Sequence, residues 1–249
     1  MSANTHCLNC KAELQGTFCH RCGQKASTHR FSVQHFVAHE MVHGIWHLDK
    51  GILYTLQGVL KCPGKLAREY VAGKRAGHFS MVTMLVLLVG LLIFILSHRT
   101  YERPNIRLGD KPMPGYVDFI AGNLKWALLI MVPIMAKSSK DLFKMLKFNY
   151  TEHVVMNGFF YAGMLFIALV FSPLYFIPGI NNLYVLAAET IAIGIYVVRA
   201  YRQATRDLYV PGIFARLITI YFFSVIGYIM FVITASVMLY NLAQSLQSH

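Results

Sequence analysis

The sequence predicts an all-α protein, an integral membrane helical bundle of about five transmembrane helices, and two observations lead to this fold class. Hydrophobic residues make up 56% of the 249 residues and charged residues only 14%, against about 25% charged in an ordinary soluble domain. Most of the surface is therefore unsuited to water. The apolar residues also gather in long stretches, and a helix needs about 20 such residues to cross a bilayer.

Five stretches are expected to cross the membrane. The first and the last carry almost no charge, whereas the second contains Lys125 and Pro133. A lysine near a helix end can extend to the interface and a proline kinks a helix, so whether the second stretch crosses fully is left open, with four spans as the alternative. The expected spans are residues 79–98, 118–136, 153–175, 181–198 and 213–240.

The distribution of lysine and arginine predicts the orientation, because these residues are most frequent in cytosolic segments. They cluster before the first span, after the second and after the fourth, at Lys61 to Arg75, Lys137 to Lys147 and Arg199 to Arg206. These three clusters fall on one side of the membrane, whereas the opposite side receives Arg99, Arg103, Arg107 and Lys111. We therefore expect a cytosolic N-terminus without a cleaved signal peptide, and a C-terminus outside.

The formal net charge of +12 could also suit nucleic acid. However, the cations lie beside apolar helices, which favours membrane lipids as the partner. No nucleic-acid partner is expected.

Four cysteines near the N-terminus form two Cys-x-x-Cys pairs, Cys7 with Cys10 and Cys19 with Cys22. Each pair can offer two thiolates to one tetrahedral zinc ion, and Gly23 suits a tight turn after the second pair. Two disulfides would be unusual in a reducing cytosol, and a redox dithiol needs only one pair. We expect a structural, non-catalytic zinc ribbon over residues 1–28. Cys62 is left over as a small apolar residue.

A histidine-rich stretch follows, and we assign residues 29–78 to an interfacial helical region, in which a short apolar helix is expected to stop at Pro63-Gly64. His35, His39, His43 and His47 recur every four residues, which places them along one stripe of an amphipathic helix. His39-Glu40-x-x-His43 also matches a zinc hydrolase pattern in which Glu40 activates water. No third ligand is apparent. Packing at the interface, a second zinc with or without catalysis, and pH sensing all remain open.

The remaining residues, 79–249, form the predicted transmembrane bundle, and one acidic residue stands out within it. Glu189 lies in the fourth span, where a carboxylate is costly unless it is protonated, paired or hydrated. A protonated Glu189 hydrogen-bonded to a neighbouring helix is the favoured interpretation, because polar contacts of this kind occur between membrane helices. A proton or cation pathway is the alternative.

Several motifs in order resemble a known family. They are Phe18-Cys19-x-x-Cys22-Gly23-Gln24, the histidine-rich helix, Asp49-Lys50-Gly51, Thr55-Leu56, Pro63-Gly64, Tyr70, Gly73-Lys74-Arg75 and, more loosely, Glu152-His153. The chain resembles an uncharacterised bacterial membrane family, catalogued as domain-of-unknown-function family three-six-six-seven, most clearly over residues 7–80. The resemblance implies a zinc ribbon fused to a helical membrane domain. It implies no reaction.

We therefore expect a bacterial inner-membrane protein that serves as a scaffold or accessory platform, with the zinc ribbon available to a protein partner at the cytosolic face. One alternative is an integral-membrane zinc hydrolase using His39, Glu40 and His43. Another is a small transporter or lipid-handling protein centred on Glu189. The sequence does not define a substrate, a partner or an oligomeric state, and self-association of the small bundle is left open.

Overall fold

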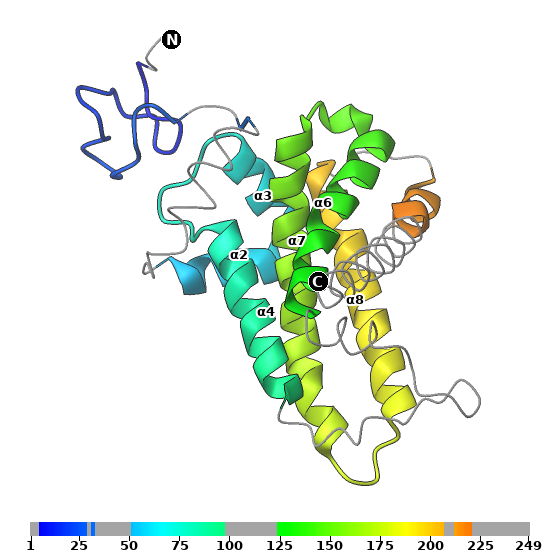
Figure 1. The fold of residues 1–249 in the computed structure, drawn as a ribbon. Coiled ribbons are helices and arrows are strands. Elements are labelled where there is room, and N and C mark those ends of the chain that lie inside the picture. The colour runs from blue at the N-terminus through cyan, green and yellow to red at the C-terminus, as the bar shows by residue number, and fades with distance from the viewer. Residues whose placement is uncertain (1–4, 29–30, 33–50, 98–123, 207–211, 221–249) are drawn as a thin grey trace, which may run out of the picture.

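A computed structural model describes residues 5–28, 31–32, 51–97, 124–206 and 212–220. Within these ranges the regular elements are helices, joined by turns and loops, and residues 5–28 form turns with two isolated β-bridges, His6 with Glu13 and Phe18 with Lys25. The long helices lie roughly along one direction, and residues 5–28 sit beyond one end of them (Figure 1).

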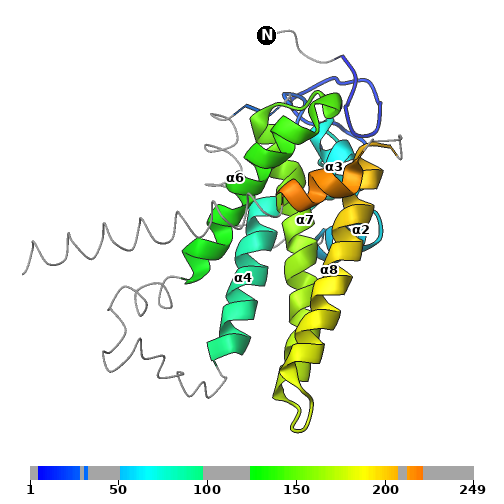
Figure 2. The same ribbon diagram turned by 90° about the vertical axis from the view of Figure 1, so that its right-hand side faces the viewer.

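Four long helices alternate in direction along the chain, as the two perpendicular views show (Figures 1 and 2). α7 lies between the other three and packs against each of them. The N-terminus of α7 and the C-termini of α6 and α8 share the end that holds residues 5–28. The helices are α4 (Met81–Ser97), α6 (Leu124–Leu142), α7 (Tyr150–Phe171) and α8 (Asn182–Ala204).

The start of α7 is fixed by a capping box. The Asn149 side chain accepts a hydrogen bond from the Glu152 backbone amide at 2.9 Å, and the Glu152 carboxylate accepts one from the Asn149 amide at 2.7 Å. Two of the free amides at the helix start are thereby satisfied. Further along, Gly158 and Gly163 let Met81 of α4 and Tyr196 of α8 approach the helix closely.

Two short helices, α2 (Ile52–Lys61) and α3 (Pro63–Val71), precede the long ones. The predicted stop at Pro63 is confirmed: α2 ends before it and α3 begins with it, as suits a residue that lacks an amide hydrogen. The pair is held on α8 by the Tyr196 hydroxyl and the Arg199 guanidinium, which donate to the carbonyls of Val59 and Lys61 at 3.1 and 2.7 Å.

Short 3₁₀ turns join the long helices. Lys144–Leu146 precedes α7 and is followed by Lys147 in the left-handed backbone region, at φ 53°. Ser172–Phe176 follows α7 and continues it toward the connection with α8. That connection lies at the end of the bundle opposite residues 5–28 (Figure 1).

The expected number of five transmembrane helices is not supported by the described residues. Two segments are long and apolar enough to cross a membrane, Tyr150–Phe176 and Asn182–Ala204. α4 is apolar but has only 17 residues. The expected span at 118–136 corresponds to α6, which continues to Leu142 and so takes in charged residues at its end. Of the expected span at 213–240, the structure describes residues 213–220, which are helical.

Candidate metal centre and its attachment to the helices

The four cysteines predicted to bind metal come together at one point. Their sulfur atoms all lie within 4.8 Å of one another. The closest pairs are Cys7 with Cys22 and Cys10 with Cys19, each at 3.5 Å between sulfurs. Zinc–sulfur bonds of about 2.3 Å place the sulfurs of a tetrahedral site about 3.8 Å apart. The cluster therefore has the size and donor set of a four-cysteine zinc site, and its cysteines are free of disulfides.

The backbone around the cysteines forms two equivalent turns, offset by twelve residues. In the first turn the Cys7 carbonyl accepts from the Lys11 amide at 2.9 Å, and in the second the Cys19 carbonyl accepts from the Gly23 amide at 2.8 Å. Lys11 and Gly23 occupy the same position and both have a left-handed backbone, at φ 64° and 73°. Gly23 was expected from the sequence to suit a tight turn, whereas the matching role of Lys11 was not.

The turns also direct backbone amides toward sulfur. The amides of Cys22 and then Arg21 lower the pKa of Cys19 to about 6, despite its burial. At Cys10 the Ala12 amide acts in the same direction, but burial and the neighbouring thiols outweigh it and raise the pKa to about 11. A first thiolate thus makes the next one harder to form. A bound divalent cation relieves this repulsion, which is why such ligands ionise together with metal binding.

Gln24 fastens this small domain to the helices. Its side chain is almost completely buried, 6% exposed. The Gln24 amide nitrogen donates to the Gly73 carbonyl at 2.8 Å, and the amide oxygen accepts from the Arg75 and Ala76 backbone amides at 3.0 and 3.1 Å. One side chain therefore satisfies three backbone groups of the loop after α3.

A second contact excludes larger side chains at the same place. Gly73 has φ 97°, and a Cβ atom on it would lie 2.6 Å from the Leu8 side chain. Glycine is thus required both by the backbone conformation and by the closeness of Leu8. The four-cysteine domain consequently rests against the loop after α3.

Aromatic residues continue this contact into the bundle. The Arg75 guanidinium lies 3.6 Å from the centre of the Phe31 ring, a cation–π contact. Phe31 stacks on Tyr70 with centroids 6.0 Å apart, and Tyr70 meets Phe159 of α7 edge-on at 5.0 Å. The loop after α3 is therefore connected to the four-cysteine domain on one side and to the core of the bundle on the other.

The other predicted site residues have different outcomes. The histidine ladder, His35, His39, His43 and His47, lies with Glu40 outside the described residues. Glu189 is half-buried and is the eighth of the 23 residues of α8, slightly before the middle of the helix. It accepts a hydrogen bond from the Tyr175 hydroxyl at 2.9 Å. Its partner thus comes from the 3₁₀ turn after α7.

A buried polar network was not predicted as a unit. Asn157 donates to the Ser139 hydroxyl and to the His153 carbonyl, both at 2.7 Å, and its oxygen accepts from the Tyr201 hydroxyl at 2.6 Å. Ser139 also lies 2.9 Å from the His153 ring nitrogen Nδ1. The network joins α6, α7 and α8 near the end that carries the four cysteines. Asn157 and His153 were visible in the sequence as polar residues in an apolar stretch, but their partners were not.

Comparison with known protein families gives one match. The family described as "Protein of unknown function (DUF3667)" matches residues 49–93. The resemblance to this family is confirmed. The matched residues include α2, α3, the loop that Gln24 contacts and the first part of α4. Neither the curated proteins nor the solved structures gave a match to the chain.

Proposed function

We propose that this protein is a scaffold of the bacterial inner membrane whose structural zinc ribbon is held rigidly at the cytosolic end of a helical bundle and receives a protein partner. The observation that carries the proposal is the attachment of Gln24 to three backbone groups of residues 73–76. A domain fixed in this way has a defined orientation toward the membrane. A flexibly tethered domain would not require this attachment of Gln24 to the backbone of residues 73–76.

The exposed side chains of the long helices support a membrane location. Along α8, large apolar side chains point away from the other helices, among them Leu183, Leu186, Ile191 and Ile195, each more than half exposed. Water would disfavour such a surface, and lipid would accept it. We propose further that the protein is multi-pass, with α4 and α6 crossing the membrane beside the two longer helices.

The distribution of charge supports the proposed orientation. Lysines and arginines of α3, the α6–α7 connection and the end of α8 share the end of the bundle that holds the four cysteines. Residues 172–182 at the other end contain no charged side chain. Under the rule that positive charge stays inside, the four-cysteine end is cytosolic.

The ribbon has an exposed aromatic residue that could contact a partner. Phe18 is 61% exposed although it lies directly before the buried Cys19. Exposed aromatic residues on a rigid surface often supply much of the binding energy in an interface. We propose Phe18 as the centre of the partner surface, and a second copy of this chain is one of the partners that it would accept.

Metal content tests the zinc assignment and the hydrolase alternative together. Full-length protein in detergent should contain one zinc per chain, lost in the Cys7→Ser/Cys10→Ser variant and retained in His39→Ala/His43→Ala. Cys62→Ser is the matched control, because this exposed cysteine lies outside the cluster. A second zinc that follows the histidines would make them a metal site, and an activity that is lost in Glu40→Gln would then distinguish the hydrolase from a non-catalytic site.

Crosslinking tests the platform. A photoreactive residue at position 18 should crosslink to a defined partner in cells, whereas one at the exposed Gln15 should not. Phe18→Ala should lose the same partner while its zinc content stays unchanged. Mass measurement of the crosslinked product separates a second copy of the chain from a different protein. Equal crosslinking from both positions would contradict Phe18 as the contact.

A further inference from the structure

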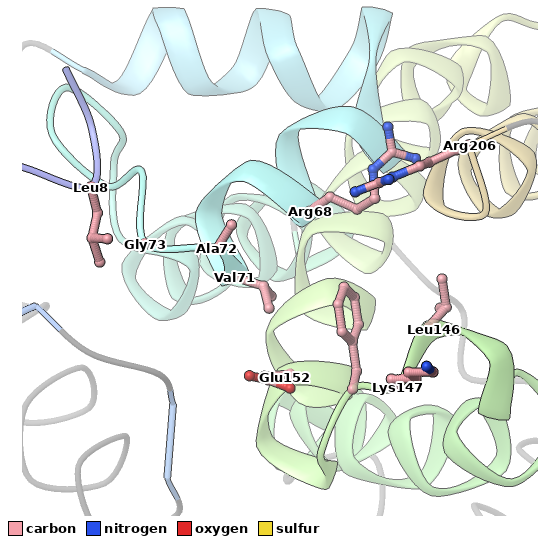
Figure 3. Close-up of a pocket in the computed structure, with 10 residues that line it drawn as sticks. Leu8, Arg68, Val71, Ala72, Gly73, Leu146, Lys147, Glu152 and Arg206 are labelled. Atoms are coloured by element: carbon pink, nitrogen blue, oxygen red, sulfur yellow. The ribbon is translucent and has the colours of Figure 1, made fainter. Parts of the chain in front are cut away.

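A cavity of about 400 Å³ lies where the four-cysteine domain meets the helical bundle. Its walls come from Leu8, the end of α3 and the loop after it, the α6–α7 connection, the start of α7, and Arg206, the second residue after α8. Figure 3 shows Arg68 and Arg206 entering it from α3 and from beyond α8, with Lys147 and Glu152 elsewhere on its wall. Segments that are distant in the sequence thus bring three cationic side chains to one cavity.

The charges of the lining are unbalanced. Arg68, Lys147 and Arg206 face a single acidic residue, Glu152. That carboxylate is almost fully buried and already accepts the Asn149 amide hydrogen in the capping box. Lys147 and Arg206 are exposed, so the cavity opens to solvent. A concave site lined by cations raises the local concentration of anions.

The backbone at two of these cations is strained. Among the described residues, three that are not glycine have a positive φ: Lys11, Lys147 and Arg206, at 64°, 53° and 58°. A side chain in this region is disfavoured relative to a right-handed conformation, and glycine avoids the cost. Two of the three line this cavity. Lys147 ends the 3₁₀ turn before α7 and Arg206 follows the end of α8, so the left-handed backbone at each also ends a helix and turns the chain at the cavity wall.

The rest of the lining is apolar and restricts the kind of anion. Leu8, Val71, Leu146 and Phe148 share the wall with the cations. The volume falls within the range of small-molecule sites, roughly 300–1,000 Å³. A phosphate group can take several charge-assisted hydrogen bonds from arginine and lysine, while an attached carbon skeleton contacts the apolar wall.

We propose that this cavity binds a phosphate ester, with Arg68, Lys147 and Arg206 contacting the phosphate oxygens. The phosphate can belong to a lipid headgroup or to a soluble ester, since both offer the same group. Because Leu8 of the four-cysteine domain forms part of the wall, the attachment of that domain completes the site. The proposal does not depend on the scaffold role.

The test uses full-length, zinc-loaded protein in a neutral detergent. Binding of glycerol 3-phosphate is measured by titration calorimetry, and binding of phosphatidylglycerol by native mass spectrometry, with zwitterionic phosphatidylcholine as the comparison without net charge. Lys147→Gly/Arg206→Gly removes two cations and the backbone strain together. We expect binding to weaken at least about tenfold, since charge-assisted hydrogen bonds are lost, while thermal stability stays equal or rises.

Lys11→Gly is the matched control. This substitution relieves the same kind of backbone strain. It also gives the first cysteine turn a glycine at the position that Gly23 occupies in the second turn. Its binding should equal that of the wild type. If the double glycine variant does not fold, Lys147→Asn/Arg206→Asn serves instead, because asparagine tolerates the left-handed backbone.

Each outcome decides the proposal. Saturable binding of glycerol 3-phosphate that the double variant loses supports the site and a soluble ester. Binding of phosphatidylglycerol alone, lost in the same variant, supports it with a lipid headgroup as the source. The proposal is overturned if the wild type binds neither probe, or if the double variant binds as tightly as the wild type.

Discussion

At the scale of single residues, Gln24 shows how one side chain determines the position of a domain. Its amide group reaches three backbone groups, and its burial keeps water from replacing it. Removing a partner from a buried polar group costs about 1–3 kcal/mol, more than the net contribution of an ordinary hydrogen bond. Loss of the Gln24 side chain is therefore expected to weaken the attachment of the four-cysteine domain substantially.

We expect Gln24→Ala to release the four-cysteine domain from the helices without loss of zinc, because the sulfur ligands are untouched. Hydrogen exchange at the Arg75 and Ala76 amides should accelerate, since both lose their acceptor. Mass spectrometry of the peptide containing residues 73–76 measures this. Gln15→Ala is the control, because Gln15 is exposed. Unchanged exchange in Gln24→Ala would show that Leu8 alone holds the domain.

His78 gives a prediction about pH. Burial lowers the pKa of His78 below its usual value, while the Glu69 carboxylate acts in the opposite direction with a smaller effect. The unfolded chain then binds the proton more readily than the folded protein does, so stability is complete above about pH 6.5 and falls as the pH decreases below that value. Thermal unfolding in detergent between pH 5.5 and 8 should show this slope.

The variant His78→Phe should reduce the slope, because phenylalanine keeps the ring contacts with Tyr54 and Tyr70 but cannot titrate. The exposed His20 provides the control His20→Asn, which should keep the slope of the wild type. Zinc content at each pH separates this effect from protonation of the cysteines. A slope that persists in His78→Phe would assign the pH dependence to another group.

At the scale of elements, the contact between α3 and α8 depends on the absence of a side chain. A Cβ atom on Gly64 would lie 2.2 Å from the Ala204 nitrogen and 2.4 Å from the Ala200 oxygen. Both are backbone atoms of α8, which cannot rotate away as a side chain can. Gly64→Ala should therefore lower the stability by about 1–3 kcal/mol, the usual cost of overpacking.

Gly90→Ala is the matched control for this prediction. Gly90 lies inside α4 and nothing stands within 4 Å of an added Cβ atom. Because alanine favours the helix by up to about 1 kcal/mol over glycine, the control should be as stable as the wild type or more stable. Thermal unfolding in the same detergent compares the two variants. Equal loss in both would mean that α3 does not pack on α8 in solution.

Local chemistry explains which elements the sequence could predict. The break at Pro63 and the four cysteines were predicted because proline lacks an amide hydrogen and because the ligands of one ion need short, regular spacing. Only two of the five expected spans are supported by the described residues, because the apolar stretches did not mark where helices begin and end, as the continuation of α6 to Leu142 shows. Partners distant in the sequence were also missed: Gln24 and Gly73 are 49 residues apart, and only folding brings them together.

At the scale of the whole molecule, the two ends of the bundle differ in charge among the residues that the structure describes. Cations and the four-cysteine domain occupy one end, and the uncharged connection between α7 and α8 occupies the other (Figure 2). A membrane across the long helices would place these ends in different compartments. The proposed platform requires the basic end to face the cytosol.

Cysteines introduced one at a time into the Cys62→Ser variant, which keeps the four clustered cysteines, can test this orientation. In spheroplasts of a bacterial host, a membrane-impermeant maleimide should label Asn182→Cys at the start of α8 and should not label Lys140→Cys near the end of α6 until the membrane is opened. Both positions are exposed, so local access does not distinguish them. The opposite pattern would place the four cysteines outside, where disulfides compete with zinc. Labelling of both positions in closed spheroplasts would place the C-terminal end of α6 and the N-terminal end of α8 on the same, outer side. The C-terminal ends of α6 and α8 would then lie on different sides, because one helix stops short of the far surface.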